Sequence, residues 1–449
     1  MPAAGDDATK FVAPGTLHHA RLDVGGAAVV YYAVGDAANA SAPRSPTYAT
    51  AGGGGRPAQY PFALLAVGDV GTQWPEARNT TARMAEAAAE GGVGLVAHVG
   101  DISYATGHSS QWADFMQAIE PLAAVVPYHT TAGNHDTLCE LGAGFDTAAC
   151  KGLGGWIPPE DWIGYLEAGG AGGECGVPYD VRFWMPPPTS VTATATVRRR
   201  QGAPRAALVA PRSFPTTADT GQAVQTGSSS PGSDPARGNL YHSVEQGPVH
   251  MAFISSEHNV SAQLGWLDAD LATVNRERTP FVLFAMHRPY YDSTLAALAP
   301  YTIAMRNLVE PVLAKHGVDL ALHGHVHSYE RTCAMLGGKC VDAARGVKYL
   351  TVGAGGAPTH APWLPAPDFI EFRSQRRRGA PTRASPGWTC STQHTCADAL
   401  CWRRRERWQT SSTSRRLGPD CRGNWLREQI TRMLLSQSIW LIFRLCMSL

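Results

Sequence analysis

The chain has 449 residues, and its 38 Lys plus Arg against 37 Asp plus Glu give a formal net charge of +1. With 44% hydrophobic and 17% charged residues, the composition excludes a disordered polyampholyte and an integral membrane protein. The length allows about two or three domains with a sizeable core. The charge is uneven, because residues 373–449 hold 15 Arg, no Lys and four acidic residues, a net +11, which leaves −10 for residues 1–372.

The first 60 residues contain too few strands for an independent domain. Short β-like runs at His18 to Leu22 and Ala27 to Val34 precede a linker rich in Gly, Pro and Ser from Asn39 to Pro61. Two or three strands cannot form a sandwich alone. The start, MPAAGDDATK, lacks the basic and apolar regions of a secretory signal. The expectation that the chain is truncated at this end comes from the family resemblance given below and not from this absence.

Residues 61–372 alternate short apolar runs with helical patterns, which is typical of an α/β protein. We expect buried strands at Phe62 to Val67, Leu95 to Val99, Val125 to Tyr128, Phe281 to Ala285 and Val318 to Leu322. We expect helices at Thr81 to Glu90, Gln111 to Ile119, Ala262 to Val274 behind Ser261 as a cap, and Ala304 to His316.

Two segments interrupt this pattern. Residues 186–238 are rich in Pro and Ser and lack apolar periodicity, which predicts a disordered surface insertion rather than a basic nucleic-acid-binding arm. Residues 373–449 form a basic tail rich in Arg and Cys. We expect this tail to be disordered or non-native, read in a shifted frame or through an intron, with a genuine tail as the alternative. The run Leu434 to Leu449 is interrupted by polar residues, so no membrane span is expected.

The ten cysteines and three glycosylation sequons suggest an oxidising compartment. Cys333 and Cys340 flank a turn-prone stretch, which favours a disulfide across a hairpin and leaves two free buried thiols as the alternative. The sequons at Asn39, Asn79 and Asn259 fit a secreted glycoprotein.

A polar cluster follows each of the five predicted strands. Ligand sites in α/β sheets form at the carboxyl ends of strands, so the pattern gathers Asp69, Asp101, Asn134, His287, His325 and His327 in one region. Carboxylate, amide and imidazole groups suit Fe, Mn and Zn, and they are too many for one tetrahedral ion. The sequence therefore predicts two metal ions.

Local geometry supports this prediction. A glycine before a ligand, as at Gly68, Gly100, Gly133 and Gly324, allows a sharp turn that a Cβ would hinder. In His325-Val326-His327, the alternation of an extended segment would place both imidazoles on one side.

The clusters read GDVG (68–71), GDISY (100–104), GNHD (133–136), FAMH (284–287) and GHVH (324–327). In these blocks the chain resembles the purple acid phosphatases within the calcineurin-like metallophosphoesterases. Flanking text, including GGECGVPY (172–179), MHRPYY (286–291) and GHVHSYERTC (324–333), is similar to the large plant, algal and fungal members. Ser/Thr protein phosphatases would have GDxVDRG in place of GDISY.

The resemblance implies a four-layer α/β/β/α sandwich in residues 61–372, with residues 1–60 as a remnant of a fibronectin-type-III-like β-sandwich. It implies a ferric ion bound by Asp69, Asp101, Tyr104 and His327. It also implies a divalent Fe, Zn or Mn ion bound by Asp101, Asn134, His287 and His325. Tyr104 would give the ferric protein its colour, and His135 would face the substrate phosphate.

The activity implied is acid phosphatase, the hydrolysis of phosphate monoesters by a metal-bound hydroxide. A phosphodiesterase or nucleotide pyrophosphatase on the same site and an inactive metal-binding fragment are the alternatives. Plant members place substrate-facing histidines where this chain has Leu295, Ala296 and Ala297, so the leaving-group acid is open. His129, His258 and His323 are expected to be structural.

The family and the sequons imply a secreted, vacuolar or cell-wall protein. The partner predicted is a phosphate ester, with neither nucleic acid nor membrane, and a homodimer is left open.

Overall fold

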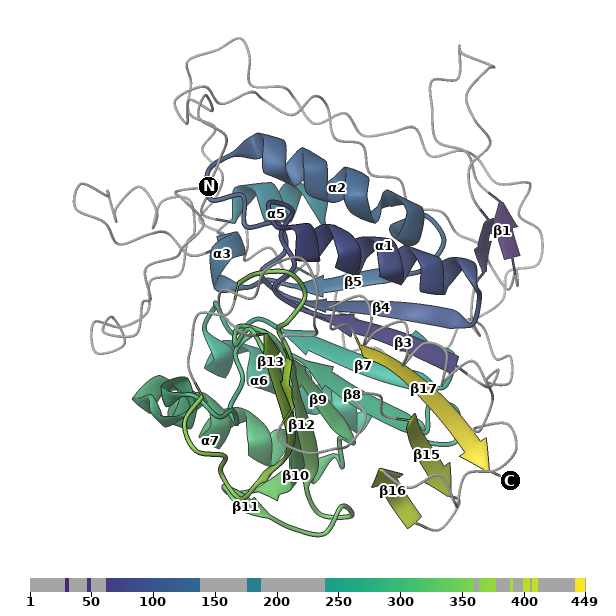
Figure 1. The fold of residues 1–449 in the computed structure, drawn as a ribbon. Helices are drawn as coiled ribbons and strands as arrows, with labels where there is room; N and C mark the ends of the chain where they lie inside the picture. Colours follow the sequence, from purple (N-terminus) through teal and green to yellow (C-terminus); the bar gives the residue numbers. More distant parts are fainter. Residues whose placement is uncertain are drawn as a thin grey trace, which may run out of the picture.

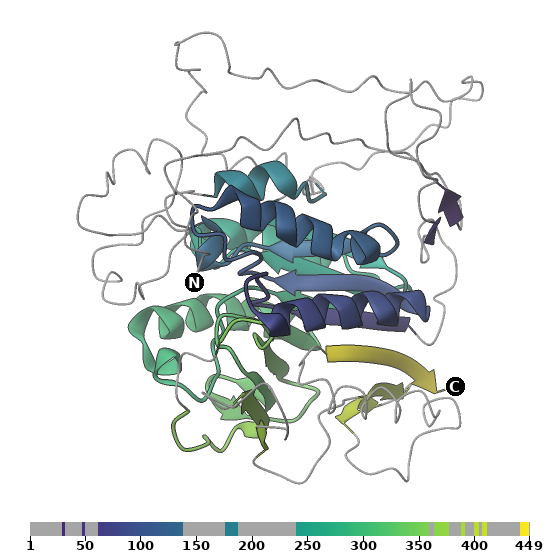
Figure 2. The same ribbon diagram turned by 45° about the horizontal axis from the view of Figure 1, so that its top comes forward.

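The computed structural model describes residues 29–31, 47–49, 62–137, 176–186, 239–358, 363–376, 388–390, 399–403, 406–410 and 441–448. Figures 1 and 2 show their helices and strands as ribbons. The predicted insertion at 186–238 lies outside the described residues, except for its first residue.

Two β-sheets form the centre of the molecule (Figure 1). In the first sheet, β3 (Phe62–Val67), β4 (Val93–Val99) and β5 (Tyr128–Thr131) pair in parallel in this order. In the second, β7 (Val249–Ile254), β8 (Phe281–Ala285), β9 (Leu320–His323) and β12 (Val347–Val352) are parallel neighbours. The carboxyl ends of each parallel set therefore lie at one edge.

Antiparallel strands extend the second sheet on both sides. β6 (Tyr241–Gln246) pairs with β7, and β10 (Tyr329–Leu336) lies between β12 and β13 (Ile370–Arg376). The short β11 (Lys339–Cys340) forms a hairpin with β10. The chain thus has an α/β fold with mixed sheets.

Helices pack against the two sheets. α1 (Pro75–Ala89), α2 (Ser109–Ala123) and the short α5 (Val177–Arg182) accompany the first sheet. α6 (Val260–Ala272) and α7 (Pro300–Lys315), with the 3-10 helix η4 (Leu295–Leu298) before α7, accompany the second. The four-residue α3 (Asn134–Thr137) follows β5 directly.

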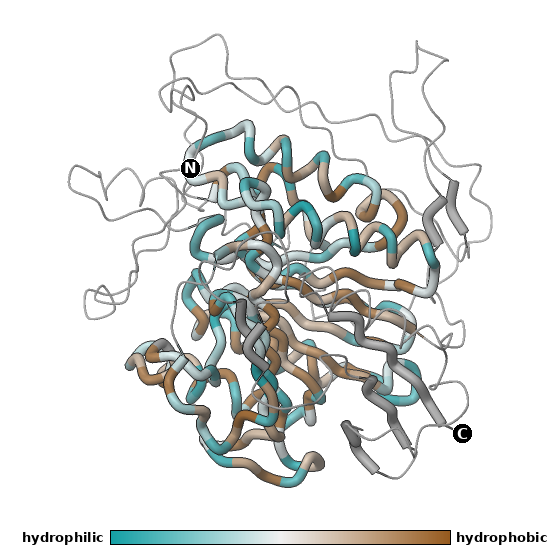
Figure 3. Tube along the Cα trace, viewed as in Figure 1, coloured by the Kyte–Doolittle hydropathy of each residue, from teal (hydrophilic) through white to brown (hydrophobic). Residues whose placement is uncertain are grey.

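Three clusters of buried apolar side chains hold these elements together. One contains side chains of both sheets, such as Leu64, Leu95, Phe253 and Leu283. A second joins β3 and β4 to α1, α2 and α5, and a third joins the second sheet to α6 and α7. Figure 3 shows the strands as a mainly hydrophobic interior and the helices as mixed in hydropathy. This packing fixes the strand ends that carry the polar clusters.

Among the strands, predicted and observed boundaries differ most at β5. The predictions at β3 and β8 match residue for residue, whereas β5 begins at Tyr128, where its predicted strand ended. The N–H groups of Val125 and Val126 both bond to Leu122 O, so these two valines complete the last turn of α2. The apolar character of the valines misled the prediction, because the end of a helix can also carry apolar residues that pack into the core.

The helix starts also differ from the predictions. α1 starts at Pro75, six residues earlier than predicted, because a proline at the first helical position lacks only an N–H that the helix does not use. The prediction of Ser261 as the α6 cap is wrong. Asn259 is the cap, and its Oδ1 accepts a hydrogen bond from Ala262 N at 3.3 Å.

Short strands also lie in both terminal regions. β1 (Val29–Tyr31) and β2 (Thr47–Ala49) pair with each other. β14 (Trp388–Cys390) pairs with β13, and β15 (Ala399–Arg403) pairs with β16 (Glu406–Thr410) and β17 (Leu441–Ser448). β17 runs antiparallel to β3 (Figure 1). The division into three domains and the nature of the tail stay predictions.

The predicted disulfide is confirmed, since Cys333 in β10 and Cys340 in β11 are joined. The side chains of Asn79 and Asn259 are exposed, and Asn39 lies outside the described residues. Within the described part, no helix combines the length and the apolar character that crossing a membrane requires.

Candidate metal centre

The structure brings the seven predicted ligands together where the two sheets meet. Asp69 follows β3, Asp101 and Tyr104 follow β4, and Asn134 follows β5. From the second sheet, His287 follows β8, and His325 and His327 follow β9. Their side chains form two groups that share Asp101. Their role as metal ligands stays a prediction.

The tyrosine group consists of Asp69, Asp101, Tyr104 and His327. The Tyr104 hydroxyl donates to Asp69 Oδ1 at 3.1 Å and lies 2.9 Å from His327 Nε2. His327 Nε2 is also 3.3 Å from Asp69 Oδ1. Ligand atoms of Asp69, Asp101 and His327 all lie within 4.8 Å of one another, close enough to surround one cation.

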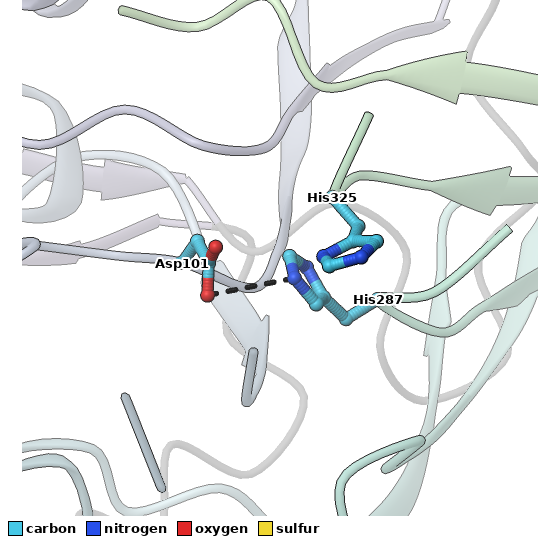
Figure 4. Close-up of side chains that lie close together, drawn as sticks. All are labelled: Asp101, His287 and His325. Atoms are coloured by element: carbon cyan, nitrogen blue, oxygen red, sulfur yellow. Dashed lines mark ion pairs between the residues drawn. The ribbon is translucent and has the colours of Figure 1, made fainter. Parts of the chain in front are cut away.

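The asparagine group consists of Asp101, Asn134, His287 and His325. Asn134 Oδ1 lies 3.1 Å from His287 Nε2 and 2.9 Å from His325 Nδ1. His287 Nε2 is 3.4 Å from Asp101 Oδ1. Figure 4 shows Asp101 and the two imidazoles arranged around a common point. Asp101, His287 and His325 can likewise contribute one ligand atom each within 4.8 Å.

The backbone is strained at the ligands more than at the glycines before them. Asp69, Asp101 and His325 have φ values of 60°, 52° and 65°, in the left-handed region that L-residues rarely adopt. Of the four predicted turn glycines, only Gly100 has a positive φ. A positive φ therefore explains the glycine at position 100 alone, and at the other three positions the predicted clash of a Cβ is what requires glycine.

The remaining glycines are required by close packing. A Cβ at Gly133 would overlap Asp101, and one at Gly324 would come within 2.6 Å of Asp69 Oδ2. A Cβ at Gly68 would press against Val99 at 3.0 Å. These glycines allow the loops to approach each other.

The prediction of an extended segment at residues 325–327 is also wrong. Val326 N donates to Gly324 O, and Ser328 N donates to Val326 O, so two tight three-residue turns follow one another. His325 reaches the asparagine group and His327 the tyrosine group from these turns. Val326 is buried.

Backbone carbonyls orient two of the three histidines. His287 Nδ1 lies 2.8 Å from Val99 O, and His327 Nδ1 lies 2.6 Å from Pro358 O. A carbonyl accepts a hydrogen bond from Nδ1–H, so in the neutral form each ring presents an unprotonated Nε2 to its group.

The asparagine group has a negative potential that favours cations. Burial opposes ionisation of Asp101, but the adjacent imidazoles, His287 first, lower the pKa of this carboxyl well below its usual value. Burial lowers the pKa of His287, but the charge and hydrogen bond of Asp101, together with the charges of Asp69 and Glu257, raise it to about 10. A pocket that stabilises an imidazolium so strongly suits a cation bound in its place.

In the metal-free protein, the pKa values of Tyr104 and Asp69 in the tyrosine group are raised, so both side chains lose their protons less readily. Burial raises the pKa of Tyr104 well above its usual value, and the charges of Asp101 and Asp69 raise it further. Burial also raises the pKa of Asp69, against the effect of His327. Binding as a phenolate therefore requires a cation of high charge at Tyr104.

His135 lies beside both groups. Its ring centroid is 4.5 Å from that of Tyr104, and its backbone N donates to Asp101 Oδ1 at 2.9 Å. Within the described part of the chain, its buried Nδ1 has no hydrogen-bond partner. This nitrogen could bond to a molecule that enters the site.

Sequence reasoning missed several residues that position the ligands. The buried Asp136 accepts hydrogen bonds from the N–H groups of Ile102 and Gly133 and so ties the second ligand loop to the third. The loop after β12 bonds to the β3 end through Gly355 N to Gly68 O. The only sequence signals for these positioning contacts are the motifs GNHD (133–136) and GAGG (353–356).

The histidines expected to be structural lie in enclosed surroundings. His129 stacks on His242 with ring centroids 5.4 Å apart, and His323 packs among aromatic rings that include Tyr290 and Tyr349. Burial lowers the pKa of His258 to about 4, and its Nδ1 lies 2.8 Å from Ser255 Oγ. These contacts fit a structural role for the three histidines, which stays a prediction.

The loop after His287 is apolar at the positions where the sequence analysis compared it with the substrate-facing histidines of plant members. Leu295 and Leu298 of η4 are 68% and 64% exposed. Their side chains cannot transfer protons, so the leaving-group acid stays open.

Comparisons with known proteins agree with this architecture. A family profile described as Calcineurin-like phosphoesterase matches residues 62–188. "Probable inactive purple acid phosphatase 9" of Arabidopsis thaliana is 35% identical over 276 residues, 60% of this chain and 35% of that protein. A "Nucleotide pyrophosphatase/phosphodiesterase" of Hordeum vulgare is 24% identical over 317 residues, 67% of each chain.

A solved structure shows the same fold. The purple acid phosphatase isolated from yellow lupin (Lupinus luteus) seeds superposes with a TM-score of 0.54 and 23% identity, over 75% of this chain and 51% of that one. The chain spans about a third of the length of the first Arabidopsis relatives it matches.

Proposed function

Because the chain contains a calcineurin-like metallophosphoesterase domain and resembles the purple acid phosphatases, we propose that it hydrolyses phosphate monoesters with the help of bound metal ions. The observation that carries this proposal is the pair of adjoining, buried ligand groups that share Asp101. The reaction proposed is that of an acid phosphatase, at acid to neutral pH.

The donor atoms fit two different cations. The tyrosine group offers a phenol and two carboxylates, hard donors that suit Fe(III). The asparagine group offers one shared carboxylate, an amide oxygen and two imidazoles, which suit divalent Fe, Zn or Mn. We therefore propose a binuclear centre with Asp101 as the bridging ligand.

Bound cations would supply an activated water and neutralise the phosphate oxygens. The protein holds the ligands in place through the strained loops and through Asp136. His135 would donate a hydrogen bond to the phosphoryl group, since its side chain lies next to Tyr104 with a ring nitrogen available. The carbonyl of Val99, at the end of β4 in the first sheet, orients His287, and the carbonyl of Pro358, in the loop after β12, orients His327.

The wider architecture proposed follows the same resemblance. It consists of a four-layer α/β/β/α catalytic domain at residues 61–372 and a fibronectin-type-III-like remnant before it. We also propose a secreted or vacuolar glycoprotein, since Asn79 and Asn259 are exposed.

A phosphodiesterase is the second candidate, because the barley relative carries that name and matches 67% of this chain. An inactive metal-binding fragment is the third, because the relative with 35% identity is named inactive. Against the third candidate, all seven predicted ligands are present and lie together.

One purified sample of the full chain would test the proposal. We expect two metal ions per chain, a visible colour from ferric tyrosinate, and faster hydrolysis of a monoester than of a bis-ester with the same leaving group. Tyr104→Phe should lose the colour. Colourless protein with less than one metal per chain would refute the proposal, and preference for the bis-ester would favour the diesterase.

A further inference from the structure

An apolar segment lies at the surface between the loop after β8 and helix α7. Residues 295–300 read LAALAP and contain no polar side chain. Leu295 and Leu298 of η4 are 68% and 64% exposed, more than any other large hydrophobic side chain in the described residues. Side chains three residues apart eclipse each other on a 3-10 helix, so the two leucines project from the same side. Together they expose an apolar surface to water.

The loop before η4 is firmly anchored, so this surface has a fixed position. Residues 288–294 are all buried. Arg288 Nε donates to Glu257 Oε1 at 2.8 Å, which ties the start of the loop to the end of β7. Ser293 Oγ donates to Glu330 Oε2 at 2.7 Å, which ties its end to β10. The two leucines therefore stand on a rigid support.

Contacts through Tyr301 place η4 at the edge of the metal centre. The Tyr301 hydroxyl, from the first turn of α7, lies 3.3 Å from Arg288 Nη1. The same Nη1 lies 3.4 Å from His325 Nε2 in the asparagine group. Leu298 precedes Tyr301 by three residues, so their Cα atoms lie within about 11 Å of each other. Only the side chains of two residues thus connect the α7 end of η4 to the asparagine group.

A second segment links the tyrosine group to the same loop. Pro358 O lies 2.6 Å from His327 Nδ1, and six residues later Leu364 N donates to Ser293 O at 2.7 Å. Leu364 is partly exposed, and its backbone bonds to the loop two residues before Leu295. We call Leu295, Leu298 and Leu364 the apolar rim.

The position of the apolar rim indicates what can cover it. A phosphate monoester bound by its phosphate at the centre has one further part, the alcohol beyond the ester oxygen. The rim side chains offer this part apolar contact and no hydrogen bond. A stable protein interface needs roughly 20–30 residues on each side, far more than the rim contains.

We propose that the apolar rim binds the alcohol part of the substrate, so that the protein favours phosphate monoesters of long-chain apolar alcohols. This inference rests on the proposed function, since it assumes that the centre binds the phosphate group. A CH₂ group that becomes fully buried tightens binding about 4-fold. A chain covered by the rim on one side only should gain about 2-fold for each CH₂, and about 10-fold for several such groups.

Alkyl phosphonates of different chain length test the inference without hydrolysis, because they have no ester bond. Calorimetric titration of the full chain with its metal ions bound should give a Kd for octylphosphonate about 10-fold below that for ethylphosphonate. The variant Leu295→Gln/Leu298→Gln should reduce this ratio to less than about 3-fold. The matched control is Leu308→Gln, the same exchange at a leucine of α7 that is 37% exposed, and it should keep the ratio.

Hydrolysis of ethyl phosphate and octyl phosphate gives a second readout. The two leaving alcohols differ little in acidity, so the ratio of their kcat/KM values reports contact with the chain rather than chemistry. Below the concentration at which octyl phosphate forms micelles, this ratio should favour octyl phosphate about 10-fold in the natural sequence. The double variant should lose most of this preference.

Equal affinities for the two phosphonates in the natural sequence would overturn the inference, as would a ratio that the double variant keeps. Hydrolysis of ethyl phosphate in the same samples would then still support the proposed function. Binding of neither phosphonate and hydrolysis of neither ester would overturn the proposed function and, with it, the rim inference. Dimerisation, or binding to phosphatidylcholine vesicles, that only the double variant loses would assign the rim to another occupant and overturn the inference.

Discussion

Glu330 is a buried carboxyl group that should make the stability of the protein fall as pH rises. Burial raises its pKa to about 7, and the neighbouring Asp292 raises it further, against hydrogen bonds from Ser293, Ser328 and Trp363. The unfolded chain loses this proton near pH 4.5, whereas the folded chain keeps it until about pH 7. Between these values the folded state binds the extra proton, so the free energy of unfolding decreases with increasing pH.

The size of the effect follows from the width of that window. At 1.36 kcal/mol for each pH unit, the window between 4.5 and about 7 corresponds to about 3 kcal/mol. Glu330→Gln removes the ionisation in both states. Relative to the natural sequence, the variant should therefore gain about 3 kcal/mol of unfolding free energy between pH 4 and pH 8.

Urea unfolding of the full chain from pH 4 to pH 8 measures this difference. Glu277→Gln is the matched control, because it makes the same chemical change at an exposed side chain. A stability difference between the Glu330 variant and the natural sequence that stays constant over this range would refute the reasoning.

Four further substitutions test the packing at the centre and the local structure elsewhere in the fold. Gly133→Ala would drive a Cβ into Asp101 and should abolish cation binding in a metal titration, whereas Gly265→Ala, in open space on α6, should raise stability by up to about 1 kcal/mol. Cys340→Ser opens a short disulfide loop and should lower the unfolding free energy by about 2 kcal/mol, with no added loss when reductant is present. Asn259→Ala removes the α6 cap and should cost about 1 kcal/mol in urea unfolding; an unchanged midpoint would contradict the capping role.

The ligand positions could be predicted from the sequence because each follows a short strand that is largely or fully buried. Phe62–Val67 and Phe281–Ala285 are both such strands, and Asp69 and His287 come two residues after their ends. Parallel pairing then places their carboxyl ends at one edge without any knowledge of side-chain geometry. For this reason, the five polar clusters that follow the predicted strands indicated a single site.

The environment of the ligands could not be predicted, because it depends on contacts between distant segments. The Arg288–Glu257 pair joins the ends of β8 and β7, and the Gly355–Gly68 hydrogen bond joins the two sheets. No local pattern encodes such pairs. The same holds for Glu330, whose pKa depends on burial beneath residues far along the chain.

The strain at the ligands connects binding to folding. Asp69, Asp101 and His325 each adopt a positive φ that costs on the order of 1–3 kcal/mol, and two of them are carboxylates held away from water. The structure tolerates this cost because the glycine contacts and the Asp136 hydrogen bonds leave the loops no alternative path. A cation held by these side chains would bind the folded chain and not the unfolded one, so its binding would add directly to the free energy of unfolding. The ligand loops are therefore where the metal-free fold is weakest and where a bound ion would stabilise it most.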